Sequence, residues 1–306
     1  MSLFRRKYIG LAISGGELRA VSLLRHGRQS KLAGGRLLTL SDGIWDPSPY
    51  QPNIKDVARF IARLREVITP LAGHEKRIAL SLPASCARVV VAEFETVFKN
   101  KEEGAQLIRW QMKNSLPGPS QDAVVDFQRL NTLENGRQRY LVAAMAGAVL
   151  EQYEAALEGA GLHGLNIAFQ PLHIGQFYHR RLDTAEPTLL VALEGGELSL
   201  QCYQEKLLRF FRQRRVQQQP EAVFQEINRS LSAMQEEFPN LSRAGILLHS
   251  DWEQQEGLAE AVQGLFSKSV IVLDPRVEQM AIRKLNLPSW RVRGLTGAIG
   301  AAEQMM

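Results

Sequence analysis

The chain has 306 residues, 45% of them hydrophobic and 23% charged. This length predicts about two domains with a large buried core, and the ordinary composition excludes a disordered or fibrous protein. The excess of 37 basic over 32 acidic residues is mild, so it does not by itself indicate a nucleic-acid-binding protein.

The first predicted elements are strands joined by glycine turns. Residues 9–13 have the apolar pattern of a strand, Gly15 and Gly16 favour a tight turn, and residues 17–24 have the pattern of a returning strand. The next glycine begins a third strand. Apolar residues at helical spacing then predict a helix, and a buried strand at residues 77–83 completes this unit. The helical positions are Ile54, Val57, Ile61, Leu64 and Ile68.

Residues 88–164 differ in pattern from the rest and are predicted to form a small inserted α+β subdomain. Three strands and two helices are expected in it, and an Asn-Gly turn joins the last two strands. A strand and a helix that begins at Pro171 then lead back to the main unit. The expected strands cover residues 89–95, 123–130 and 139–145, the first helix covers 101–115, and the second ends near Gly159 or Gly161.

The tetrapeptide Gly-Gly-Glu-Leu occurs at residues 15–18 and again at 195–198, each time between two apolar strands. This repeat predicts an internal duplication in which each half begins with a strand–turn–strand hairpin. After the second copy we expect a strand at 207–215 and a long amphipathic helix after Pro220. Two strands around a helix and a closing helix follow. Their ranges are 244–250 and 269–275 for the strands, and 254–267 and 294–302 for the helices.

Several stretches resemble the type IV pilus assembly protein PilM family, which is related to the cell-division protein FtsA and to GspL-type secretion proteins. The most specific is the helix–turn–strand segment QLIRWQMKNSLPGPSQDAVVDFQRL at residues 106–130. Similar stretches occur at 140–171, 227–235 and 244–275. The resemblance therefore touches most of the chain.

The resemblance implies an α/β, actin-like (ribonuclease H-like) fold made of two duplicated lobes. The first lobe is expected at residues 1–187, with the inserted α+β subdomain at 88–164, and the second lobe at 188–306. The helical lid subdomain of the second lobe is expected to be reduced or absent, because the arginine-rich strand leads directly into the helix after Pro220. In this fold, two hairpins grip the phosphates of a nucleotide in the cleft between the lobes.

At the implied nucleotide cleft, the residues that would hold magnesium and phosphate are missing. Ala12 and Ala192 stand where working relatives have aspartates, and a methyl group offers no oxygen ligand to magnesium. Glu194 stands in place of a glycine, so its carboxylate would repel phosphate. We therefore expect a pseudo-ATPase without cofactor, metal or catalytic residues. The degenerate set is Ala12, Ser14, Gly15, Gly16, Ala192, Glu194, Gly195, Gly196, His249 and Ser250.

Two alternatives stay open at this point. An active actin-like ATPase switch would need substitute magnesium ligands such as Glu194 or Asp251. The sequence RFFRQRR at residues 209–215 interleaves aromatic and basic residues as single-strand nucleic-acid binders do, although inward Phe and outward Arg on a strand explain the same pattern. We expect no nucleic-acid partner. We also expect Arg19, which matches a family lysine, to be a solvated strand residue.

The resemblance implies a cytoplasmic scaffold of a bacterial type IV pilus or type II secretion platform. Such a scaffold receives the cytoplasmic tail of a PilN-like inner-membrane protein in a groove between the first subdomain and the insertion. An extended peptide suits a groove, because main-chain hydrogen bonds give affinity and apolar pockets select side chains. The residues expected to bind it are Trp110, Lys113, Leu116, Pro117 and Phe127.

No segment has the pattern of a signal peptide or a membrane helix, so a cytoplasmic location is expected. The opening MSLFRRK is a weak motif for peripheral contact with the inner membrane, and a frayed terminus is the alternative. His173 and His179 are expected to be surface residues on different faces of a helix. Cys86 and Cys202 are far apart and outside any metal motif, so we expect buried, reduced thiols.

Overall fold

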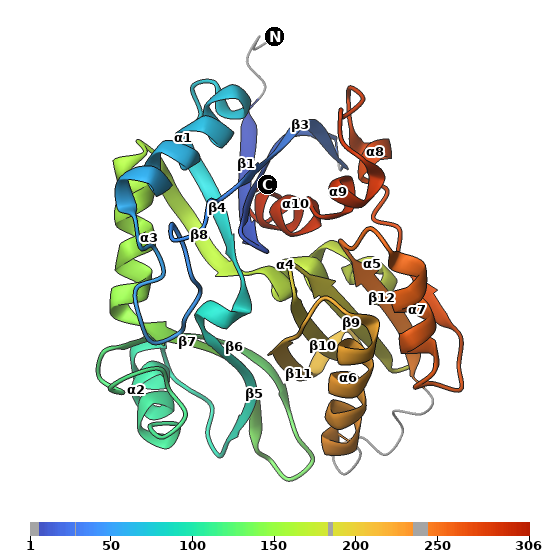
Figure 1. Ribbon diagram of the computed structural model, residues 1–306. Coiled ribbons are helices and arrows are strands. Elements are labelled where there is room, and N and C mark those ends of the chain that lie inside the picture. The colour runs from blue at the N-terminus through green and yellow to red at the C-terminus, as the bar shows by residue number, and fades with distance from the viewer. Residues whose placement is uncertain (1–5, 28, 183–185, 235–243) are drawn as a thin grey trace.

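The described residues form two five-stranded sheets, a smaller three-stranded sheet and the helices that cover them (Figure 1). The computed structural model describes residues 6–27, 29–182, 186–234 and 244–306. Residues 1–5, which begin the basic segment considered for membrane contact, lie outside the described residues. Among the described helices, none combines the length and the apolar character needed to cross a bilayer.

The two larger sheets have the same topology. The strand order is β3-β2-β1-β4-β8 in the first sheet and β11-β10-β9-β12-β13 in the second. In each sheet the first three strands along the chain pair antiparallel, and the last two continue in parallel. The expected duplication is therefore confirmed by strand order and direction. The strands are β1 (Lys7–Ser14), β2 (Glu17–His26), β3 (Gln29–Thr39), β4 (Arg77–Leu82) and β8 (His163–Phe169), then β9 (Thr188–Glu194), β10 (Glu197–Gln204), β11 (Leu207–Arg215), β12 (Gly245–Ser250) and β13 (Val270–Val272).

Each larger sheet begins with a hairpin whose turn is a pair of glycines. Gly15 and Gly16 have φ angles of 56° and 73°, and Gly195 and Gly196 have φ angles of 56° and 82°. Two successive positive φ angles are typical of the type I′ turn, which fits the strand twist and favours glycine. β1 and β9 are buried along almost their whole length, which explains why both strands are continuously apolar.

The inserted subdomain is a three-stranded antiparallel sheet with helix α2 (Lys101–Gln111) on one face. α2 is shorter than the predicted helix over residues 101–115. The chain turns after Gln111, and Pro117 disfavours helical backbone at the residue before it. The strands are β5 (Arg88–Phe94), β6 (Ala123–Thr132) and β7 (Gln138–Ala146), in the order β5-β7-β6. The core under α2 consists of Phe94, Ile108, Tyr140 and Val142.

Further helices pack beside the two larger sheets. α1 begins at Val57 because Asp56 caps it, accepting a hydrogen bond of 3.0 Å from Arg59 N. Ile54, which was expected in this helix, is buried in a short bridge with Trp45. α1 packs against α3, and α6 packs against α7. These elements are α1 (Val57–Ala72), the 3-10 helix η1 (Ala84–Cys86), α3 (Gly147–Gly159), α6 (Pro220–Met234) and α7 (Gln255–Gln263).

The two halves of the chain exchange helices. α10, from the second half, packs on β1 so closely that a Cβ at Gly10 would overlap the Ala298 carbonyl, and Figure 1 shows it in red against the blue strands. α4, from the first half, contributes Ile174 to a cluster with Leu190 and Leu247 of the second sheet. The helices are α4 (Gln170–Phe177), α5 (His179–Leu182), α8 (Val277–Met280), α9 (Ser289–Arg293) and α10 (Thr296–Glu303). The division of the chain between the lobes stays a prediction.

Candidate functional site

The two glycine turns touch each other between the sheets. A Cβ placed on Gly15 would lie 2.9 Å from Gly195 Cα, and one placed on Gly195 would overlap the backbone nitrogen of Gly15. Backbone therefore contacts backbone where the resemblance implies the phosphates of a nucleotide. Glycine is required in both turns for two reasons, because φ is positive and because no side chain fits at the contact.

The two alanines at the positions where the resemblance implies magnesium-ordering aspartates are packed in apolar clusters. Ala12 is fully buried on β1 with Leu295 and Ala298. Ala192 is buried on β9 with Ile174 and other apolar residues. An aspartate at either position would bury a carboxylate among hydrocarbon groups, which is unfavourable. The packing thus explains why both positions hold a small apolar residue.

Glu194 is held by the protein itself and does not face an open cleft. It is 3% exposed, and Gln170 Nε2 donates a hydrogen bond to its Oε2. His249 Nε2 lies 2.7 Å from Glu194 Oε1, and the Tyr178 hydroxyl lies 2.9 Å from His249 Nδ1. Burial raises the pKa of Glu194, and the hydrogen bond to His249 opposes that rise. The carboxylate expected to repel phosphate is therefore already engaged by protein groups.

Arg19 is buried, so the expectation of a solvated strand residue is wrong. Only 5% of its surface is exposed, and its Nη2 lies 2.7 Å from Asp251 Oδ2 in the other half of the chain. Glu17 and Glu194 lie 3.3 Å and 3.5 Å from the same guanidinium. Burial alone would lower the pKa of Arg19, but the carboxylates, with Asp251 first among them, raise it above its ordinary value.

Asp251 links this arginine to the second glycine turn. The backbone nitrogen of Gly195 donates to the Asp251 carboxylate at 3.2 Å, beside the ion pair with Arg19. Both predicted substitute magnesium ligands are therefore already engaged by protein donors. Among the described residues, no three His, Cys, Asp or Glu side chains come together as a metal site would require. We call the following set the interlobe network: Glu17, Arg19, Glu194, His249, Asp251 and Arg291.

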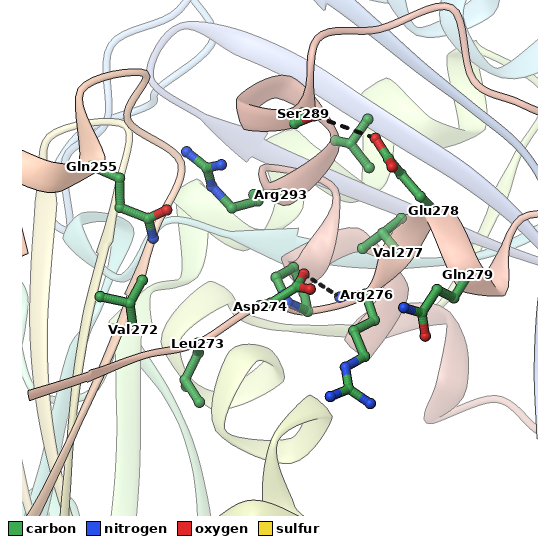
Figure 2. A pocket seen from close by; sticks show the side chains of 12 residues that line it. Gln255, Val272, Leu273, Asp274, Arg276, Val277, Glu278, Gln279, Ser289 and Arg293 are labelled. Carbon is green, nitrogen blue, oxygen red and sulfur yellow. Dashed lines mark hydrogen bonds between the residues drawn. The ribbon is translucent and has the colours of Figure 1, made fainter.

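The loop after β12 is covered by an arginine. Arg293 donates to the Trp252 carbonyl at 2.6 Å and to the Ser250 carbonyl at 3.1 Å. Figure 2 shows Arg293 facing Gln255 across a cavity of about 320 Å³, and the same two residues also line a second cavity of about 660 Å³. Five cavities lined by described residues have volumes of about 320 to 660 Å³, and none of these five is lined by Gly15, Gly195 or Glu194.

An open groove runs between the insertion and the first sheet, and we call it the β6–β8 groove. It has a volume of about 470 Å³ and lies between β6, β7, β8, α4 and the turn after β10. β6 and β8 are both edge strands, so each presents one backbone edge without a neighbouring strand in its sheet. The lining is partly apolar and partly polar. Its residues include Gln128, Leu141, Ala143, Asn166, Ile167, Leu172 and Tyr203.

The structure does not bring the five predicted partner-binding residues together. Phe127 lines the β6–β8 groove and also packs on the core under α2. Trp110 is 74% exposed on α2, and Lys113 is exposed beyond the end of that helix. Leu116 is buried in a small core, and Pro117 lines a different cavity beside β5 and β11. Sequence reasoning missed Leu141 and Ala143, although their alternation with the buried Tyr140 and Val142 places them on the opposite face of β7.

His173 is fully buried, so the expectation of a surface histidine is wrong for this residue. Its Nδ1 lies 2.7 Å from Ser81 Oγ, and burial lowers its pKa to about 4. His179 is exposed, as expected. Cys86 and Cys202 are buried thiols, also as expected.

Three of the four arginines of β11 lie within ion-pair distance of an acidic side chain. Arg212 and Arg214 lie 3.5 Å and 3.7 Å from Glu226, and Arg209 lies 3.3 Å from Glu205. Phe211 packs in the larger core, so the aromatic rings of this strand serve the interior. Internal packing and ion pairing account for the pattern that also suggested a nucleic-acid surface.

Comparison of the sequence with protein-family models gives no match. Comparison with curated proteins gives no match either. Solved structures do match. A chain of the PilM-PilN type IV pilus biogenesis complex superposes with a TM-score of 0.75 at 16% identity, covering 98% of this chain and 99% of that chain.

Two further structures have similar folds. A Bacteroides thetaiotaomicron protein with an actin-like ATPase fold and unknown function matches with a TM-score of 0.57 at 10% identity, covering 90% of this chain and 95% of that chain. The cytoplasmic domain of EpsL, an inner-membrane component of the type II secretion system of Vibrio cholerae, matches with a TM-score of 0.52 at 10% identity. The match covers 95% of this chain and 94% of that chain. The α/β, actin-like fold with duplicated lobes is thereby confirmed.

Proposed function

We propose that this chain is a cytoplasmic, PilM-like scaffold of a bacterial type IV pilus or type II secretion inner-membrane platform. It holds the cytoplasmic tail of a PilN-like membrane protein and reaches the inner membrane through that partner. It does not bind ATP. The fold shared with a PilM-PilN complex and with a secretion component supports the choice of system.

The β6–β8 groove is the observation that carries the binding part of the proposal. An extended peptide can pair its backbone with an exposed strand edge while its side chains enter pockets. The groove offers the edges of β6 and β8 together with the apolar side chains of Leu141, Ala143 and Ile167. A segment of several residues in extended conformation therefore finds both kinds of contact there.

The contact between the two glycine turns supports the loss of nucleotide binding. Phosphate groups need donors and open space between the hairpins, and here Gly15 touches Gly195 instead. Arg19 already has carboxylate partners, and both aspartate positions are buried alanines. Calorimetric titration with magnesium-ATP tests this part, and we expect no binding at millimolar nucleotide. Micromolar binding or measurable hydrolysis would instead support the alternative of an active actin-like ATPase switch.

Peptide binding is tested with a synthetic peptide of the cytoplasmic tail of the PilN-like protein from the same genome. Leu141→Arg and Ala143→Arg place a long charged side chain in the groove, so each should weaken binding at least about tenfold, or 1.4 kcal/mol. Val97→Arg is the matched control, because Val97 is 49% exposed and lies outside the groove lining. Unchanged affinity in both groove variants would contradict the proposal.

The residues predicted from sequence have their own test. Trp110→Ala removes an exposed ring on α2, at a position that does not line the groove. If the groove is the binding site, this variant should bind the peptide as the wild type does. Loss of binding in Trp110→Ala, together with normal binding in the two groove variants, would move the site to the outer face of α2.

A further inference from the structure

A cavity with several basic lining residues lies on the surface near α10, and we call it the basic pocket. It has a volume of about 550 Å³ and is lined by β2, β3, α4, α5, the segment before α8, and the end of the chain. Its charged lining residues and histidine are Arg25, Lys31, His179, Arg180, Arg276 and Glu303. Of these six residues, only His179 also lines the β6–β8 groove. None of the six belongs to the interlobe network.

Three cations in this pocket have no acidic partner in direct contact. Lys31 comes from β3, Arg180 from α5, and Arg276 from the turn before α8. No ion pair or side-chain hydrogen bond joins any of the three to another residue in the described part of the chain. Several strand arginines, by contrast, have an acidic partner, as Arg212 has in Glu226. Like charges gathered around one cavity repel one another, and the four cationic side chains outnumber the one carboxylate side chain, Glu303, so this arrangement favours an anion.

Glu303 is the one carboxylate side chain among the lining residues, and it is already engaged. Ser30 Oγ donates a hydrogen bond to Glu303 Oε1. Burial raises the pKa of Glu303, while Ser30 and the nearby His179 and Arg180 oppose that rise. Arg25 is also engaged, because its Nη1 donates to the Met306 carbonyl at 2.8 Å. Lys31, Arg180 and Arg276 are therefore the groups left to meet a ligand.

The backbone at Arg276 points to a role beyond packing. Three non-glycine residues in the described ranges have positive φ, and two of them form the turn between β10 and β11. Arg276 is the third, with φ of 53°, a conformation unfavourable for any residue with a Cβ. Asp274 Oδ1 stabilises it by accepting a hydrogen bond of 2.8 Å from Arg276 N. Arg276 lines both the cavity of Figure 2 and the basic pocket, so its side chain lies where the two adjoin.

We infer that the basic pocket binds a phosphate-bearing ligand through Lys31, Arg180 and Arg276. Guanidinium groups pair with phosphate oxygens in a bidentate manner, and a lysine adds a point charge. Three cations from three segments surround a compact volume, which suits one small, multiply charged anion better than a long acidic chain. The volume lies within the range of small-ligand sites, about 300–1,000 Å³. The same chemistry is present in a free diphosphate and in the headgroup of an acidic phospholipid.

The test uses two probes on the full chain. The first is inorganic pyrophosphate, titrated calorimetrically at about 150 mM salt. At this ionic strength, interactions between exposed charges are largely screened. The second is sedimentation with vesicles of phosphatidylcholine, with and without one fifth phosphatidylglycerol. Binding of pyrophosphate alone identifies a soluble phosphate ligand, whereas binding of acidic vesicles that pyrophosphate displaces identifies a lipid headgroup.

The variants separate the pocket from general charge effects. Arg180→Gln and Lys31→Gln should each weaken binding about tenfold, because each removes a charge-assisted contact. Arg59→Gln is the matched control, since Arg59 is an exposed cation on α1 outside the pocket, and it should bind normally. Arg276→Gly removes the cation and relieves the unfavourable backbone, so it should lose binding without a lower unfolding temperature.

Two results would overturn the inference. One is the absence of binding for both pyrophosphate and acidic vesicles. The other is equal weakening by Arg59→Gln and by the pocket variants, which would mean that only net charge matters. Neither result bears on the peptide groove, whose binding assay uses a different ligand and different variants.

Discussion

Arg19 Nη2 and Asp251 Oδ2 lie 2.7 Å apart, although 232 residues separate them along the chain. The pair joins β2 of the first sheet to the loop that follows β12 of the second. Both side chains are almost fully buried. Gly195 N also donates to Asp251, and Glu194 also lies beside Arg19. An internal ion pair therefore spans the space between the two larger sheets, where the resemblance implies a nucleotide.

Replacement of the buried arginine should destabilise the protein strongly. Arg19→Met leaves Asp251 and Glu194 buried without their cation, a change that typically lowers the free energy of unfolding by about 3–5 kcal/mol. Urea denaturation measures the loss. Arg63→Met is the control, because Arg63 pairs with Glu66 at the surface and should change stability by less than about 1 kcal/mol. Similar losses in the two variants would show that the interlobe pair contributes little.

The contact between the glycine turns predicts unequal effects of the same substitution. Gly16→Ala and Gly195→Ala both force a Cβ into a left-handed backbone, which destabilises by about 1–2 kcal/mol. Only Gly195→Ala also drives that atom into the backbone of Gly15, whereas Gly16 has open space around it. We expect Gly195→Ala to lose a further 1–3 kcal/mol or so of unfolding free energy. Equal losses in urea denaturation would contradict the contact.

The buried His173 predicts a loss of stability in mild acid. Its pKa is about 4 in the folded protein and about 6.5 when exposed, so the unfolded chain takes up a proton first as the pH falls. The free energy of unfolding should therefore fall between pH 6.5 and pH 4, by about 2–3 kcal/mol from this residue. His173→Gln should show a correspondingly shallower pH dependence in denaturation measured from pH 7 to pH 4.5. Parallel curves for the variant and the wild type would contradict this assignment.

Because α10 packs closely on α4, a methyl group added to α10 at this contact should destabilise the protein. A Cβ at Gly300 would overlap the His173 carbonyl, so Gly300→Ala should lower the unfolding free energy by about 1–3 kcal/mol. Gly257→Ala, at an exposed position of α7, meets only Pro220 at 4.0 Å and should be neutral or stabilising. Thermal unfolding of the two variants provides the comparison, and a stabilised Gly300→Ala protein would exclude the predicted overlap.

The fold was accessible from sequence because its signals are local. The two Gly-Gly-Glu-Leu turns, the continuously apolar strands and the amphipathic helices each predicted an element that the structure contains. The differences lie at element ends, where a local interaction such as the Asp56 cap decides the boundary. The exchange of α4 and α10 between the halves could not be predicted, because it depends on packing between segments far apart in the chain.

The site was predicted only in part, for the same reason. The family resemblance assigned Ala12, Ala192 and Glu194 to the magnesium and phosphate positions of a nucleotide cleft, and the loss of nucleotide binding there stays a prediction. The burial of Arg19 was missed because its partner Asp251 comes from the other half of the chain. A groove between the first subdomain and the insertion was expected, but of the five residues predicted for it only Phe127 lines the β6–β8 groove, since the lining of a groove depends on how sheets are placed and not on any one segment.

The exchanged helices have a consequence for biosynthesis. While the ribosome is still translating the second half, β1 lacks the cover that α10 provides, so the hydrophobic face of the first sheet stays open to solvent. A nascent chain of this protein should therefore need chaperone protection until α10 has emerged. Prematurely terminated products should be rapidly degraded by proteases rather than accumulate as a folded first lobe.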